Sequence, residues 1–390
     1  MMRRSKVRIR VPLASAITAV ALVLTSAAFG APAALGSAAS ARSTATAAST
    51  TTAASTTASV PSAVKADMNE LLKSVNPNTG LIGTSWWQAA VALSTVETYQ
   101  QTTGDTSDEI LPFLTYLDNK SGAFEDNFDD DTAWWALVWL QYYDITHGTV
   151  YLHAAETDAD YIHEDWSSVC GGGVWWQRSP NYYKNAIANE LFLELTAWLH
   201  NTIRGDKKYL AWAKAEWNWF DHRSGMIKTS YLISDGPSGP GEKGRCVNTS
   251  AKQGQKIWTY NQGVILAGLA QLYTATRDKA YLTEAKRIAN AAISHLTVRG
   301  VLTEQCSENG CGTGAQSFKG IFVRDLTMMA VIAKTTAYNS FFTKQAKSIE
   351  AKDTNSHHQL GVFWAGPIAD RTSWSQASAL DALVASLKLP

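Results

Sequence analysis

The stretch that decides the fold is FDDDTAWWAL, residues 128–137, in which three aspartates run directly into an apolar segment. One aspartate suffices to cap a helix and to complement the positive end of its dipole, a contribution of about 0.5–2 kcal/mol. From Ala133 to Tyr143 nearly every residue is apolar, which predicts a helix that neighbours bury on all sides. Three carboxyl groups at the start of a buried helix exceed what a start signal needs, so this stretch is a candidate site.

The chain from residue 64 onward predicts a succession of helices, because apolar residues recur at intervals of three and four. About twelve helices are expected, over residues 64–75, 86–103, 108–120, 131–146, 150–165, 181–203, 207–221, 258–276, 279–296, 319–336, 338–351 and 374–388. Similar short turns, such as residues 146–152, 204–210 and 277–282, join them.

The helix before each such turn is the more apolar one, and the helix after it is the more amphipathic one. This alternation is expected when an inner ring of helices is wrapped by an outer ring. The sequence therefore predicts an all-α fold, an (α/α)6 barrel of six helical hairpins. An open helical solenoid is the alternative, but it does not account for the long Gly-rich segments that follow the outer helices.

The first sixty residues differ from the rest in composition. Five basic residues between Arg3 and Arg10 precede an apolar run over residues 11–29, and Ala39-Ser40-Ala41 offers a cleavage site of small residues. This pattern predicts a signal peptide over residues 1–41 and a secreted, extracellular protein, with a membrane anchor as the weaker alternative. Residues 42–63 are almost only Ser, Thr, Ala and Val and predict a disordered tether.

Charge and aromatic content indicate the kind of partner. The chain has 34 basic and 34 acidic residues, so no basic surface for nucleic acid or for an anionic membrane is expected. With 390 residues, 45% of them hydrophobic, it can bury a large core. Its 15 Trp and 14 Tyr exceed what that core requires, and such rings stack well on the apolar faces of sugars.

The cysteines and histidines predict disulfides rather than a metal site. Four cysteines in an exported chain favour disulfide bonds. Cys306 and Cys311 enclose a short polar loop and form the simplest pair, in which case Cys170 and Cys246 would join distant loops; three connectivities remain possible. Because no C-x-x-C or H-E-x-x-H spacing is present, no metal and no cofactor is expected.

Irregular segments lead into several predicted inner helices, and each carries side chains that can bind hydroxyl groups. CGGGVWW (residues 170–176) precedes YKNAIANE (183–190), the long stretch 222–257 leads into WTYNQG (258–263), and FKGIFVRD (318–325) opens a further hairpin. Closure of the barrel would gather these side chains around one opening. The residues expected to bind the ligand are Asp129, Trp134, Trp135, Trp176, Asn185, Asp235, Tyr260, Asn261, Gln262 and Arg324. For Asn261 and Gln262 the alternative is helix capping, and for Arg324 it is an ion pair with a structural acid.

Four segments in this order, DDTAWWAL, CGGGVWW with YKNAIANELF, TYNQG and FKGIFVRD, resemble glycoside hydrolase family 76, the endo-α-1,6-mannanase family, over about residues 65–388. The resemblance implies an (α/α)6 barrel, cleavage of α-1,6-mannosidic linkages with retention, and no cofactor. It also implies that the two aspartates before x-Ala-Trp-Trp, here Asp130 and Asp131, are catalytic. Asp129 is an additional acid, which leaves the register open by one residue.

The chemistry of glycoside cleavage needs two carboxyl groups in different states. One must be ionised to attack the anomeric carbon, and the other must keep a proton for the leaving oxygen. Asp130 near the free N–H groups of the helix start fits the nucleophile, and Asp131, crowded by that charge and by tryptophan rings, fits the acid and base. A carboxyl separation of about 5–5.5 Å would support retention, and one of about 6.5–9.5 Å inversion.

The expected protein is thus a monomeric, secreted endo-α-1,6-mannanase that acts on α-mannan, with a catalytic domain over residues 64–390. The alternative is a cell-wall glycan-binding or transglycosylating protein of the same fold that hydrolyses little. The intact pair Asp130 and Asp131 favours catalysis.

Overall fold

Eleven α-helices make up most of the part of the chain that the computed structural model describes, which is residues 61–106, 124–180, 183–237, 246, 254–304 and 312–388. The helices are α1 (Ser62–Leu72), α2 (Trp86–Thr103), α4 (Asp129–Thr146), α5 (Thr149–His163), α6 (Ala186–Thr202), α7 (Lys208–His222), α8 (Thr259–Thr276), α9 (Lys279–His295), α10 (Ala315–Ile332), α11 (Asn339–Lys352) and α12 (Ser373–Leu387). The predicted signal peptide, most of the predicted tether, the predicted helix 108–120 and the pair Cys306 and Cys311 lie outside the described residues.

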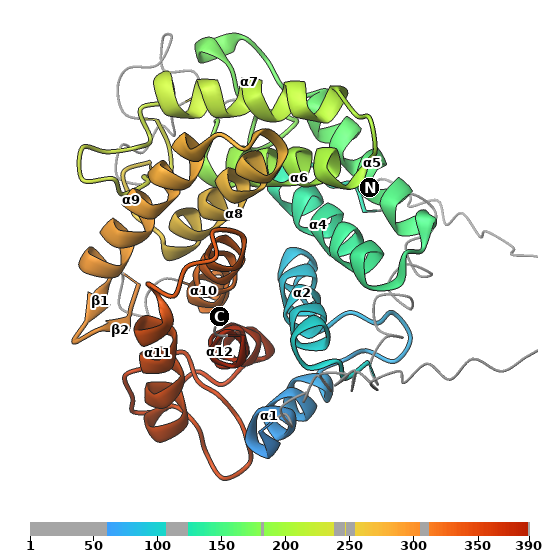
Figure 1. Ribbon diagram of the computed structural model, residues 1–390. Coiled ribbons are helices and arrows are strands. Elements are labelled where there is room, and N and C mark those ends of the chain that lie inside the picture. The colour runs from blue at the N-terminus through green and yellow to red at the C-terminus, as the bar shows by residue number, and fades with distance from the viewer. Residues whose placement is uncertain are drawn as a thin grey trace, which may run out of the picture. The chain divides into compact units, whose positions relative to one another are not determined.

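Six of these helices, α2, α4, α6, α8, α10 and α12, form a closed inner ring (Figure 1). Each contacts the next in this order, and α12 returns to contact α2. This last contact excludes the open solenoid and confirms the predicted (α/α)6 barrel. None of the helices in the described part is both long and apolar enough to span a membrane.

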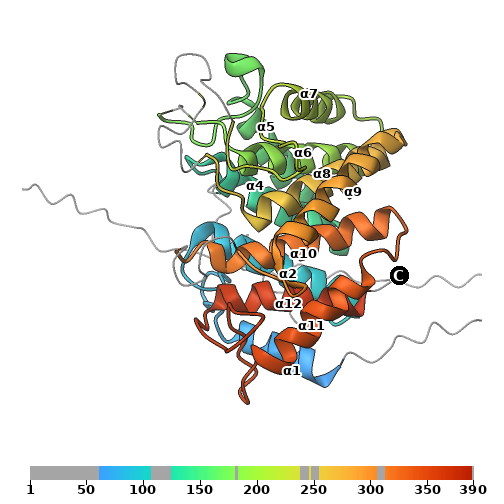
Figure 2. The ribbon, with the colours of Figure 1, turned by 90° about the vertical axis from the view of Figure 1, so that its left-hand side faces the viewer.

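The other helices form an outer layer. Helix α5 packs on α4 and α6, α7 on α6 and α8, and α9 on α8 and α10, whereas α1 and α11 both pack on α12. Figure 2 shows the same layering from the side, with α7 beyond α6 and α8. Each outer helix therefore covers the joint between inner helices or the back of one of them.

The burial of the helices explains why the sequence separates into these two rings. Inner helix α8 buries nearly every residue from Thr259 to Leu272, so no face of it is left for water. Its outer neighbour α9 buries a single stripe at three- and four-residue spacing: Leu282, Ala285, Ile288, Ala289 and Ala292. The all-round apolar pattern predicts an inner helix, and the one-sided pattern predicts an outer helix.

Two glycines allow neighbouring inner helices to approach closely. A Cβ atom at Gly320 of α10 would lie 2.4 Å from the Cα of Ser378 in α12, and one at Gly263 of α8 would lie 2.5 Å from the Cα of Phe322 in α10. Backbone cannot move aside as a side chain can, so no larger residue fits. These contacts outweigh the roughly 0.5–1 kcal/mol that glycine costs inside a helix.

Most predicted helix bounds agree with the structure to within a few residues, with three informative differences. Helix α10 begins at Ala315, four residues before the predicted start, and ends at Ile332, because Lys334 adopts a left-handed conformation with φ 49°. Helix α6 begins at Ala186 rather than at residue 181, since the Asn185 side chain accepts a hydrogen bond from the Ala188 N–H and caps the helix. Helix α1 begins at Ser62, inside the predicted tether.

A short hairpin follows α9 that the sequence analysis did not predict. Strands β1 (Thr297–Val298) and β2 (Val301–Leu302) pair antiparallel through Arg299 and Gly300, which both have positive φ, at 54° and 80°. Positive φ at both central residues is the geometry of the tight turns that hairpins favour. Two-residue strands are too short for an alternating pattern to reveal.

The centre of the barrel is polar. Four buried carboxyl groups, from Glu97 of α2, Glu194 of α6, Asp325 of α10 and Asp381 of α12, surround the guanidinium of Arg324; we call these four the axial acids. Arg324 Nη1 lies 3.6 Å from Asp381 Oδ2, and its Nε lies 3.6 Å from Asp325 Oδ1. Burial raises the pKa of each axial acid, and the charge of Arg324 opposes this rise.

Candidate active site

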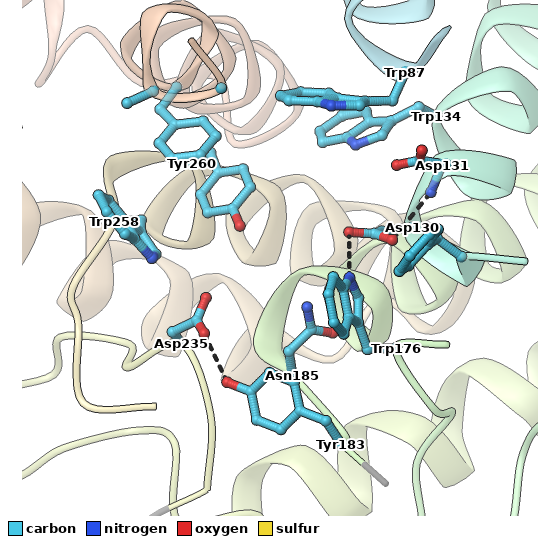
Figure 3. A pocket seen from close by; sticks show the side chains of 14 residues that line it. Trp87, Asp130, Asp131, Trp134, Trp176, Tyr183, Asn185, Asp235, Trp258 and Tyr260 are labelled. Carbon is cyan, nitrogen blue, oxygen red and sulfur yellow. Dashed lines mark hydrogen bonds between the residues drawn. The ribbon is translucent and has the colours of Figure 1, made fainter. Parts of the chain in front are cut away.

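A cavity of about 410 Å³ opens where the inner helices begin (Figure 3). Its lining comes from the starts of α2, α4, α6, α8 and α10 and from the loops before them. The lining residues are Trp87, Phe128, Asp130, Asp131, Trp134, Trp176, Tyr183, Asn185, Asp235, Trp258, Tyr260, Gly314, Ala315 and Phe318. The parallel inner helices thus bring residues that are far apart in the sequence to one opening, which we call the catalytic cavity.

Asp130 and Asp131 lie side by side in the first turn of α4 and both face the catalytic cavity. The indole Nε1–H of Trp176 donates to Asp130 Oδ2 at 3.1 Å, and the backbone N–H of Asp131 donates to Asp130 Oδ1 at 3.2 Å (Figure 3). Both oxygens of Asp130 therefore accept a hydrogen bond, which favours its ionised form. The free N–H groups of the helix start act in the same direction.

The surroundings of the two carboxyl groups separate their protonation. Burial raises the pKa of Asp130, whereas the hydrogen bonds from Trp176 and from the backbone lower it. Burial also raises the pKa of Asp131, and the neighbouring charges of Asp130 and Asp126 raise it further. The two carboxyl groups lose their protons in two steps that belong to the pair, and the hydrogen bonds from Trp176 and from the Asp131 backbone favour the ionised form of Asp130 in the first step.

A third carboxyl group, Asp235, lies across the catalytic cavity from this pair (Figure 3). The hydroxyl of Tyr183 donates to Asp235 Oδ2 at 2.6 Å. Burial raises the pKa of Asp235, and its contacts with Tyr183 and Asn261 lower it. Because the backbone N–H of Ala186 donates to the Asp235 carbonyl at 2.8 Å, this loop is fixed to the start of α6.

Aromatic rings form two walls of the catalytic cavity. On one side Trp87 stacks with Trp134 at 6.4 Å between ring centroids, and Tyr260 stacks on Phe318 at 3.8 Å. On the other side Trp176 lies beside Asp130. Carboxyl groups between ring faces are the combination that binds a pyranose, because the hydroxyls need acceptors and the C–H faces need apolar surface.

Two amide side chains hold the segments that carry Trp176 and Asp235. Asn189 accepts from the Val174 N–H at 2.8 Å and donates to the Val174 carbonyl at 3.1 Å. Gln262 makes the same pair of bonds to Ile233, at 2.8 and 2.9 Å. Val174 also forms an antiparallel bridge with Trp166, and Ile233 forms one with Ile227, so each segment is held from two sides.

A disulfide between Cys170 and Cys246 joins the two loops that flank the cavity, as predicted for this pair. The backbone N–H of Lys184 donates to the Cys246 carbonyl at 3.2 Å, and the Lys184 ammonium donates to the Gly172 carbonyl at 2.6 Å. Gly173 has φ +85°, and a Cβ there would lie 2.5 Å from the Trp219 ring. Only glycine fits this position of the CGGGVWW segment.

The structure brings together at the catalytic cavity seven of the residues singled out from the sequence, namely Asp130, Asp131, Trp134, Trp176, Asn185, Asp235 and Tyr260. Five others do not line it. Asp129, the first residue of α4, is fully buried with its Oδ1 3.9 Å from Arg178 Nη1, and burial next to Asp165 raises its pKa to about 10. The prediction of Asp129 as a ligand-binding residue is therefore corrected.

The remaining four are also supporting residues. Trp135 is buried in the core, with its ring 4.8 Å from that of Trp86. Gln262 and Asn261 are fully buried beneath the Asp235 loop. Arg324 lies among the axial acids, which agrees with the alternative of a structural ion pair.

Sequence analysis did not single out Trp87, Phe128, Tyr183, Trp258 or Phe318 as site residues, although all five line the cavity. Trp87 is the second residue of α2, and Trp258 immediately precedes α8. Both lie at or just before the start of an inner helix, which is the criterion that identified the other site residues, so the same criterion could have identified these two.

A family model described as Glycosyl hydrolase family 76 matches residues 41–389. The chain is 29% identical over 216 residues to mannan endo-1,6-alpha-mannosidase DFG5 of Saccharomyces cerevisiae, which covers 52% of this chain and 45% of that protein. It is 26% identical over 279 residues to mannan endo-1,6-alpha-mannosidase DCW1 of Candida albicans, and this alignment covers 64% of this chain and 59% of that protein. The chain thus spans about half of the length of these relatives.

Solved structures share the fold. The GH76A α-1,6-mannanase from Salegentibacter sp. HEL1_6 matches with a TM-score of 0.74 at 23% identity, over 84% of this chain and 99% of that one. An inactive variant of that enzyme with two consecutive aspartates replaced, solved in complex with α-1,6-mannotriose, matches with the same TM-score at 22% identity and the same coverage.

Proposed function

The chain belongs to Glycosyl hydrolase family 76, and from this we propose that it is a secreted hydrolase that cleaves α-1,6-mannosidic linkages within mannan and retains the anomeric configuration. The observation that carries the proposal is the adjacent pair Asp130 and Asp131 at the start of α4, both facing a cavity walled by aromatic rings. The two curated relatives above are mannan endo-1,6-alpha-mannosidases by name, and the Salegentibacter variant that lacks two consecutive aspartates is inactive and is seen with an α-1,6-mannotriose.

In the first half of the proposed reaction, an oxygen of ionised Asp130 attacks the anomeric carbon of the mannose unit at the cavity. Asp131 gives its proton to the departing O6 of the next unit as the C1–O6 bond breaks. The products are a mannosyl ester on Asp130 and a shortened chain with a free hydroxyl. The order of deprotonation described above gives each carboxyl group the state that this step needs.

In the second half, Asp131 is ionised and takes a proton from a water molecule, which attacks the same carbon and releases Asp130 as a carboxylate. Two displacements leave the product with the configuration of the substrate. Asp235, held by Tyr183, is placed to accept hydroxyl groups of the bound sugar, and Trp176 and Tyr260 supply ring faces beside it.

The direct test is incubation of the purified protein with linear α-1,6-mannan, with α-1,2- and α-1,3-linked mannans as controls. We expect oligosaccharides from the α-1,6-linked polymer alone, with the α-anomer appearing first in the proton NMR spectrum. The β-anomer appearing first would mean inversion, and no release from any mannan would reject the proposed hydrolysis. Products longer than the substrate would identify transglycosylation instead.

Replacement of Trp176 separates two contributions of its side chain. Trp176→Phe keeps a ring but removes the hydrogen bond that lowers the pKa of Asp130. Because the reaction needs ionised Asp130, the acid limb of the pH profile of kcat/KM should move to higher pH in this variant. Trp176→Ala should show the same displacement and also weaken binding of α-1,6-mannotriose by about 1 kcal/mol or more. An unchanged acid limb in both variants would show that this hydrogen bond does not tune the nucleophile.

A further inference from the structure

A second cavity, of about 200 Å³, lies at the opposite end of the barrel, where the inner helices end. Its walls include Thr98 of α2, Gln141 of α4, Trp198 of α6 and Gln271 of α8. Trp134 lines both this cavity and the catalytic cavity, so its indole ring forms the partition between them. Apart from Trp134, the two cavities share no lining residue.

The floor of the second cavity carries the axial acids Glu194 and Asp325 together with Arg324, whose Nε lies 3.6 Å from Asp325 Oδ1. Glu194 lines the cavity and is only 3% exposed. Asp325 also lines it, and its Oδ2 is buried without a hydrogen-bond partner in the described part of the chain. A buried polar group without a partner is costly, so groups of this kind that face a cavity point to a ligand that supplies the missing bonds.

The walls above this floor offer amides and an indole. Gln141 donates to Thr98 Oγ1 at 3.0 Å, and Gln271 Oε1 accepts from Asn201 at 2.9 Å. The Trp198 Nε1–H donates to Asp144 Oδ2 at 3.1 Å, which fixes the orientation of its ring. The second cavity thus combines amides that can make further hydrogen bonds, carboxyl groups and an oriented ring. The catalytic cavity has groups of the same kinds.

The charges that line the second cavity restrict the charge of its ligand. Arg324 and Lys388 face it together with Asp144, Glu194 and Asp325, so both signs are present and a neutral ligand with hydrogen-bond donors and acceptors fits it best. No group of three or more His, Cys, Asp or Glu side chains among the described residues is placed to hold a metal ion. Hydroxyl groups are donors that satisfy the unpartnered Oδ2 of Asp325 without bringing charge.

We propose that the second cavity binds a single neutral pyranose unit, such as a mannose side branch or chain end of the polysaccharide. Its volume, half that of the catalytic cavity, suits one ring rather than a chain. Binding at both cavities would raise affinity for polymeric mannan through effective concentration.

This inference rests on the proposed function only for the choice of mannose as the probe. The test uses the full-length Asp130→Asn/Asp131→Asn protein with 15N-labelled tryptophan, titrated with methyl α-D-mannopyranoside, and the Trp198 indole signal is assigned with Trp198→Phe. We expect the Trp198 signal to shift in a saturable manner. Adding Trp176→Ala, which alters the catalytic cavity alone, should leave this curve unchanged, whereas Gln141→Met should weaken binding at least several-fold.

Hydrolysis provides an independent readout in the otherwise unmodified enzyme. Trp198→Ala should leave kcat/KM for α-1,6-mannotetraose unchanged, which also reports an intact fold, and should raise KM for polymeric mannan. No saturable shift at Trp198, or a shift that disappears with Trp176→Ala, would overturn the second site. If Trp198 responds as expected while no mannan is cleaved, the second site stands and the proposed hydrolysis fails.

Discussion

Asp130→Asn and Asp131→Asn should each lower kcat/KM for α-1,6-mannan by roughly a thousandfold or more, while the helical circular dichroism spectrum and the melting temperature stay close to those of the parent protein. An amide at residue 130 cannot form the mannosyl ester, and one at residue 131 cannot shuttle the proton. Both side chains face the catalytic cavity and are only partly buried, so an isosteric amide leaves the packing of α4 intact.

The chain supplies a matched control in the adjacent Asp129. Its carboxyl group is buried outside the cavity, and with its pKa raised to about 10 it is already neutral at pH 7. Asp129→Asn should therefore keep activity within a few-fold of the parent. If Asp129→Asn removed activity and Asp130→Asn did not, the register of the catalytic pair would be shifted by one residue.

Chemical rescue distinguishes the two roles. In Asp130→Ala, azide can enter the space of the missing carboxylate and attack the α-linked substrate directly, which gives β-mannosyl azide. In Asp131→Ala, azide attacks the ester already formed on Asp130, which gives α-mannosyl azide. Exchange of these products between the two variants would reverse the assignment of nucleophile and acid.

The barrel could be predicted from the sequence because local patterns determine it. All-round apolar segments such as residues 133–143 alternate with one-sided ones, and the turns between them resemble each other. Since the inner helices run parallel, a residue near the start of any of them is brought to the same end of the ring. That rule placed Trp176, Asn185, Asp235 and Tyr260 correctly at the cavity without any knowledge of contacts.

The rule fails where the direction of a side chain decides its role. Trp134 lines the cavity and Trp135 is in the core, although they are adjacent, because successive residues of a helix point about 100° apart. A helix that is apolar on all sides gives no sequence signal for which face meets the cavity. The bond between Tyr183 and Asp235 joins residues 52 apart and follows from loop geometry, which no local pattern contains.

Arg324→Met should destabilise the fold by about 3–5 kcal/mol near neutral pH, because it removes a buried cation from among the axial acids while leaving their carboxyl groups buried. Arg287→Met on the exposed face of α9, where the arginine pairs with Glu284 at 3.0 Å, is the control and should change stability by no more than about 0.5 kcal/mol. Urea unfolding of the three proteins gives both values.

The pH dependence separates charge from packing in this prediction. Burial raises the folded-state pKa of Asp325 to about 7 and of Asp381 to about 6. With respect to these two groups, the free energy of unfolding is therefore highest below their unfolded pKa values and falls as the pH rises toward the folded values. Without Arg324 the folded pKa values rise further, so the loss with pH becomes steeper. The difference between Arg324→Met and the parent should therefore be smallest near pH 4 and grow through pH 7, and Asp381→Asn added to Arg324→Met should restore part of it. A difference that stays constant between these pH values would show that Arg324 stabilises the barrel through its packing and not through its charge.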